Sequence, residues 1–113
     1  MNKRITITPA TGTWVVRAGG AVLGESSTAL ELIEGSYPPV IYFPREDIAM
    51  AFLDVTDTRT TCPHKGEATY YSIIAKSGAI RDAAWSYEDP KDAVAEIKGH
   101  LAFYPEKVAV EEV

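Results

Sequence analysis

The sequence predicts a mainly β fold: a compact, single-domain antiparallel sheet structure with one short helix. Its 113 residues suffice for one hydrophobic core and are too few for two. Apolar residues make up 46% of the chain and charged residues 24%, which is the balance of a globular domain and not of a disordered chain. Short β-prone runs recur between Gly and Pro residues. We therefore expect a whole protein that consists of the single domain 1–113.

The strands expected in the first half are short runs that end at turn-forming residues. They are 4–8, 13–18, 21–25, 26–34 and 40–43. The second and third form a hairpin, because Gly19-Gly20 between them tolerates the positive φ of a tight turn. Segment 26–34 also fits a helix through Leu30 and Ile33, but the alternation of Leu30 and Leu32 favours a strand.

The second half contains further β-prone runs and the one short helix. The expected strands are 58–61, 67–75, 79–87, 101–104 and 108–110. The helix is expected over 91–98, where Asp89 can cap it, Pro90 suits its first position and Gly99 ends it.

The two halves of the chain resemble each other at one point. Segments 40–44 and 101–105 share an apolar, aromatic run that ends in proline, and each is preceded by a glycine-turn hairpin. This pattern suggests two pseudo-repeated β units. The alternative is a chance likeness of two short strand ends, since short repeats are weak evidence.

Charge and hydropathy exclude several kinds of partner. The chain has 16 acidic and 11 basic residues and a net charge of -5, with its cations spread along the sequence, so we expect no nucleic acid. No segment is long enough to span a bilayer, and the start of the chain lacks the apolar core of a signal peptide. We expect a cytoplasmic protein without membrane contact, and the sequence leaves its oligomeric state open.

The single cysteine limits metal and disulfide chemistry. Cys62 has no second cysteine with which to form an internal disulfide, and a four-thiolate zinc site is impossible. Cys62, His64 and His100 could supply three zinc ligands, but paired ligands at the usual spacing are missing. We expect no metal ion and no cofactor.

The loop 60–66 concentrates chemical groups between two strands. Lys65 supplies a cation, and Gly66 allows a left-handed turn in which backbone amides converge on an anion. This predicts a small phosphate or carboxylate pocket; the alternative is an ordinary turn with an exposed lysine. Cys62 is a candidate catalytic nucleophile, because a neighbouring cation favours the thiolate. Its alternative role is that of a small buried hydrophobe.

Aromatic residues near this loop suggest a second part of the pocket. Trp85 and Tyr87 lie two apart on an expected strand, so their side chains share one face. Together with Tyr70, and with Tyr42 or Tyr104, they would line an aromatic pocket for a ring or a cation. The alternative is ordinary core packing.

Four motifs carry a resemblance to a known family. They are Tyr42-Phe43-Pro44, the run 61–71, the run 85–90 and Phe103-Tyr104-Pro105. In their order and coverage they resemble the bacterial domain-of-unknown-function family 427 (DUF427). The resemblance implies a compact, mainly β domain and a candidate site at residues 62–66 with Trp85 and Tyr87. It implies no particular activity. His64 departs from the apolar or aromatic residue of the family motif, so Lys65 is the stronger site candidate.

Together these observations predict a domain that binds a small molecule, in particular an anionic metabolite. Lys65 and Gly66 would bind the anionic group, and Trp85, Tyr87 and Tyr70 the apolar part. Two alternatives remain open. One is an enzyme that uses Cys62 on a small metabolite, and the other is a protein-interaction module that presents a strand edge or an aromatic patch.

Overall fold

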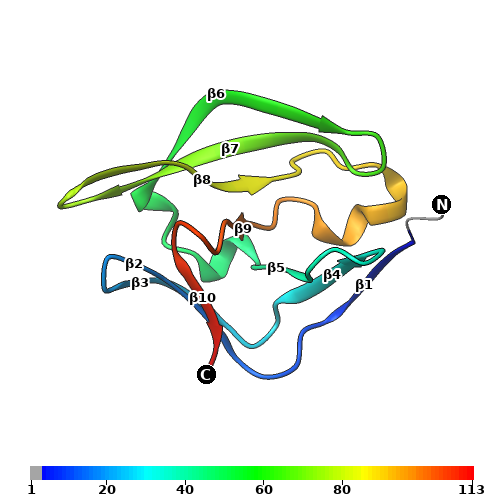
Figure 1. Ribbon diagram of the computed structural model, residues 1–113, viewed down its shortest axis with the longest axis horizontal. Coiled ribbons are helices and arrows are strands. Elements are labelled where there is room, and N and C mark those ends of the chain that lie inside the picture. The colour runs from blue at the N-terminus through cyan, green and yellow to red at the C-terminus, as the bar shows by residue number, and fades with distance from the viewer. Residues whose placement is uncertain (1–3) are drawn as a thin grey trace.

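The computed structural model describes residues 4–113, which form strands and short 3₁₀ turns (Figure 1). The strands are β1 (Ile5–Pro9), β2 (Trp14–Ala18), β3 (Ala21–Ser26), β4 (Leu30–Glu34), β5 (Val40–Tyr42), β6 (Leu53–Cys62), β7 (Gly66–Ala75), β8 (Gly78–Ser86), β9 (Ala102–Phe103) and β10 (Ala109–Glu112). The 3₁₀ turns are η1 (Arg45–Asp47), η2 (Met50–Phe52) and η3 (Asp92–Ile97). The predicted mainly β fold is confirmed. The first three residues of the expected domain 1–113 lie outside the described residues.

The strands form three antiparallel sheets, with the orders β6-β7-β8-β9, β1-β4-β5 and β10-β2-β3. In Figure 1 the long strands of the four-stranded sheet form one layer, and the two smaller sheets lie opposite it. Phe43 and Leu101 join the layers, because each accepts a backbone hydrogen bond from the other, at 2.8 and 2.9 Å. Among residues 4–113 no helix is long and apolar enough to cross a membrane.

Buried apolar side chains form two clusters between the layers. The larger one includes Phe43 and Phe103, whose rings meet edge to face at a centroid distance of 5.9 Å. The smaller one lies beside the β4–β5 sheet. Its buried members are Leu32, Tyr42, Ala68, Tyr70, Tyr87, Val94, Ile97 and Ala102. Large aromatic side chains dominate this smaller cluster, and it adjoins the site described below.

Most of the expected strands are present. Gly19-Gly20 turns the predicted hairpin β2–β3, with both glycines at positive φ, and segment 30–34 is a strand as favoured. Strand β6 is longer than the predicted 58–61, since it begins at Leu53. The pairing of β6 with β7 is interrupted between Val55 and Arg59, and the β-prone run 58–61 marks only the part of β6 at and after this interruption.

The predicted helix over 91–98 is wrong in type and in its cap. Residues 92–97 form a kinked 3₁₀ segment with Val94 out of the helical region, and Lys91, not Asp89, occupies the N-cap position. A helix this short gains too few hydrogen bonds to pay for its nucleation. Val94 and Ile97 lie three apart and are both fully buried, a spacing that suits the three residues per turn of a 3₁₀ helix. Gly99 follows at positive φ, in the position expected.

The two similar segments of the sequence lie side by side. Strands β5 and β9 come from 40–44 and 101–105, and the Phe43–Leu101 bridge connects them. Their sheets differ in the number of strands, three against four. The pseudo-repeat therefore stays a prediction.

Candidate functional site

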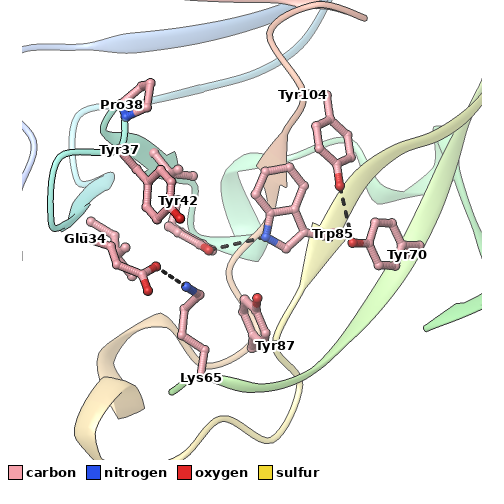
Figure 2. A pocket seen from close by; sticks show the side chains of 11 residues that line it. Glu34, Tyr37, Pro38, Tyr42, Lys65, Tyr70, Trp85, Tyr87 and Tyr104 are labelled. Carbon is pink, nitrogen blue, oxygen red and sulfur yellow. Dashed lines mark hydrogen bonds and ion pairs between the residues drawn. The ribbon is translucent and has the colours of Figure 1, made fainter. Parts of the chain in front are cut away.

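A cavity of about 260 Å³ opens between the β4–β5 sheet and the β7–β8 sheet (Figure 2). Its lining residues are Leu32, Glu34, Tyr37, Pro38, Val40, Tyr42, Lys65, Tyr70, Trp85, Tyr87 and Tyr104. Tyr42 and Tyr104, the two alternative members of the predicted aromatic pocket, are both among them, and four further residues predicted from the sequence meet at the same place. They are Lys65, Tyr70, Trp85 and Tyr87.

Strand alternation explains why these side chains face one another. Leu32 and Glu34 lie two apart on β4, and Tyr42 lies on β5, which pairs with β4. On the opposite sheet Tyr70 of β7 and Trp85 of β8 are directly paired. Residues two apart on a strand, or paired across strands, share a face of the sheet. The cavity is the space between two such faces.

The aromatic side chains form a connected wall. Trp85 lies at its centre, and its Nε1–H donates to the Tyr42 hydroxyl at 3.3 Å. The Trp85 and Tyr104 rings lie 4.5 Å apart at an angle of 44°. Tyr70 stacks on Tyr104, and their hydroxyls are 3.3 Å apart. These contacts between neighbouring side chains fix the orientations of the rings.

Three phenols that line the cavity, those of Tyr42, Tyr87 and Tyr104, stay neutral at physiological pH. Burial raises the pKa of Tyr42 to about 12. Burial also raises the pKa of Tyr87, and burial with the Tyr70 hydrogen bond raises that of Tyr104. A phenol with a raised pKa is a poor source of phenolate base or nucleophile. The wall therefore offers apolar faces and neutral hydroxyls.

The charged end of the cavity is a buried ion pair. Lys65 Nζ donates to Glu34 Oε1 at 2.6 Å, and the two side chains are only 11% and 14% exposed. Lys65 was predicted from the sequence as a site residue, whereas Glu34 was not. The available signal was its position two residues after Leu32, which places a carboxylate on the apolar face of a strand.

The turn between β6 and β7 positions Lys65. The Lys65 N–H donates to Cys62 O at 3.3 Å, and Lys65 O accepts from Lys91 N–H at 3.0 Å. Gly66 has a φ of 114°, and a Cβ there would lie 3.5 Å from the carbonyl oxygen of Asp89. Gly66 thus shapes the turn that holds Lys65 and is not among the residues that line the cavity.

Cys62 lies beside the cavity without lining it. Its half-buried side chain packs against the smaller apolar cluster, and His64 is exposed. Within residues 4–113 no side-chain hydrogen bond joins Cys62 to His64 or Lys65, and no three His, Cys, Asp or Glu side chains are grouped so as to hold a metal ion. A nucleophilic role for Cys62 stays a prediction.

The family model described as a domain of unknown function (DUF427) matches residues 6–113. The chain belongs to the DUF427 family. The predicted resemblance is confirmed, and the match includes both walls of the cavity. No curated protein matches this DUF427 chain.

A second, more apolar cavity of about 520 Å³ adjoins the first. The two cavities share four lining residues, Tyr37, Pro38, Val40 and Trp85. The second is completed by residues of all three sheets, including Trp14 and Phe103. Trp85 is therefore a wall common to both cavities.

Proposed function

We propose that this DUF427 domain binds a small metabolite that combines an anionic group with an apolar or aromatic part. The observation that carries the proposal is the position of Lys65. Its ammonium lies among aromatic side chains at the end of the cavity, and the residue is only 9% exposed. Concave sites with apolar walls and a few fixed polar groups are typical of small-molecule binding.

The size of the cavity supports a small ligand. Its volume of about 260 Å³ is just below the range of roughly 300 to 1,000 Å³ that drug-sized ligands occupy. A metabolite with one ring, or a branched apolar chain of similar size, fits this space. Its ring would pack on Trp85, and the hydroxyls of Tyr70 and Tyr104 would offer hydrogen bonds.

Lys65 keeps binding capacity although it is paired with Glu34. An ammonium has three N–H donors. Among the described residues Lys65 Nζ donates to one acceptor, Glu34 Oε1. An anionic ligand group would therefore accept from the remaining donors, and the ion pair would hold the ammonium in place.

The test is a thermal-shift screen of the wild type and Lys65→Met. The panel contains aromatic carboxylates, amino acids, sugar phosphates and nucleotides, because a compound that binds only the folded state raises the Tm. Each shift is measured against the same protein without ligand, so any loss of stability in the variant cancels. The exposed Lys76→Met is the matched control. We expect a compound that shifts the wild type and the control but not Lys65→Met.

Equal shifts in Lys65→Met and the wild type would show that Lys65 takes no part in binding. No shift with any compound of the panel would contradict the proposed function.

A further inference from the structure

We infer that the ligand is a zwitterion, an apolar or aromatic α-amino acid whose carboxylate binds Lys65 and whose ammonium binds Glu34. This inference rests on the proposed function and adds Glu34 to it as the second recognition group. The observation behind it is that the only two charged side chains lining the cavity, within residues 4–113, are opposite in sign and in contact at 2.6 Å.

Charge balance favours a zwitterion over a plain anion. Lys65 and Glu34 together carry no net charge, and both are nearly buried. A ligand with an anionic group alone would be attracted by Lys65 and repelled by Glu34, and it would add an unbalanced charge beside two nearly buried side chains. A ligand with adjacent positive and negative groups pairs with both side chains.

Both partners have hydrogen-bonding capacity left for such a ligand. Lys65 uses one of its three donors, as described above. The Glu34 carboxylate offers about four acceptor sites. Among the described residues, its hydrogen bond to Lys65 uses Oε1, which leaves Oε2 for an incoming ammonium. The head group can therefore bind without breaking the ion pair.

The aromatic wall determines the class of amino-acid side chain. Figure 2 shows the ion pair at one end of the cavity, Trp85 at the centre, and Tyr70 and Tyr104 beyond it. A ligand whose head group lies on the ion pair would direct its side chain toward Trp85. Apolar contact with the aromatic rings there favours an aromatic or branched apolar side chain.

Three probes that share one ring separate the possibilities on the wild-type protein. They are L-phenylalanine, 3-phenylpropanoate, which lacks the ammonium, and 2-phenylethylamine, which lacks the carboxylate. Titration calorimetry measures the Kd of each. We expect phenylalanine to bind about tenfold tighter or more than either analogue, because one hydrogen bond to a charged group supplies a factor of this size.

Variants assign each charge to its partner. Glu34→Gln is expected to weaken the binding of phenylalanine and 2-phenylethylamine but not that of 3-phenylpropanoate. Lys65→Met is expected to weaken the binding of phenylalanine and 3-phenylpropanoate but not that of 2-phenylethylamine. Glu31→Gln is the control, because Glu31 lies on the same strand but lines only the adjoining cavity.

Binding of 3-phenylpropanoate as tight as that of phenylalanine would overturn the zwitterion inference and leave the proposed function standing. Failure of all three probes, with a panel hit that is not an apolar or aromatic amino acid, would overturn the inference and leave the proposed function standing. Failure of every compound in both experiments would overturn the proposed function as well.

Discussion

Among single residues, the ion pair of Lys65 and Glu34 is the feature on which the proposed function depends, and it also bears on stability. Two charges that are nearly buried attract each other strongly, but each is costly when it is left alone. Removal of either side chain should therefore destabilise the fold. The interaction between the two can be measured through the free energy of unfolding, without any knowledge of the ligand.

We predict that Lys65→Met and Glu34→Met each lower the free energy of unfolding by about 3 kcal/mol, because each leaves a buried charge without its partner. The double variant should lose much less than the sum. Urea denaturation of the four proteins gives the coupling free energy as a double-mutant cycle. Additive losses would mean that the two side chains do not interact in solution.

A second residue-scale prediction concerns the buried phenol of Tyr42. Burial raises its pKa from 10.0 to about 12, so the folded state holds this proton more tightly than the unfolded chain does. The associated stabilisation is complete below pH 10 and is lost as the pH rises toward 12. The Tm of the wild type should fall across this interval, and that of Tyr42→Phe should fall less steeply. Equal slopes would contradict the account.

Residue chemistry made part of the site predictable. Lys65 stood out as a cation beside a glycine in a loop, and Trp85 and Tyr87 stood out by their spacing on a strand. Glu34 did not, because its partner is 31 positions away and a single carboxylate at a strand end usually faces water. Gly66 has the positive φ expected of its turn but is not among the residues that line the cavity, and its part in anion binding stays a prediction.

At the scale of elements, three strands of the large sheet are connected through Asp82. This residue has a φ of 48°, which is unusual for a side chain other than glycine. Its carboxylate oxygens accept from the hydroxyls of Thr56 and Thr58 on β6, both at 2.7 Å. Its N–H donates to Ser72 Oγ on β7 at 3.0 Å. Asp82 thus holds together the irregular pairings of β6 and β8 with β7.

This arrangement predicts an acid-sensitive contribution to stability. The Thr56 and Thr58 hydroxyls hold the pKa of Asp82 below its ordinary value of 3.8. The contribution is therefore present above pH 3.8 and is lost as the pH falls through the lower folded-state pKa. Asp82→Asn, which tolerates the same φ, should cost about 1 kcal/mol at neutral pH and flatten the acid limb of the Tm curve. If the decrease in Tm at low pH were the same in Asp82→Asn as in the wild type, carboxylates other than Asp82 would be responsible for it.

Elements were predictable where local pattern decides them. The β2–β3 hairpin followed from two glycines, and β7 followed from a dense run of β-branched and aromatic residues. The start of β6 and the 3₁₀ form of η3 could not be predicted from local pattern. The pairing of β6 with β7 is interrupted between Val55 and Arg59, and the burial of Val94 and Ile97 in the folded structure determines the form of η3.

At the scale of the whole molecule, the cavity exists because two sheets face each other. Its walls come from β4 and β5 on one side and from β7 and β8 on the other, and the Phe43–Leu101 bridge connects these sheets at the end of β5. Sheet order could not be predicted, because pairing between strands far apart in the chain depends on the completed fold and not on local pattern. Any ligand in the cavity would contact both layers and stabilise their association.

The most direct test of this account uses the two tryptophans as internal probes. Trp85 Nε1–H donates to Tyr42 inside the cavity, whereas Trp14 Nε1–H donates to Thr11 O away from it. A proton–nitrogen correlation spectrum resolves the two indole N–H signals, and Trp14→Phe assigns them. We expect titration with L-phenylalanine to shift the Trp85 signal progressively to saturation and to leave the Trp14 signal in place. An unchanged Trp85 signal with phenylalanine and with every compound of the screening panel would contradict the account.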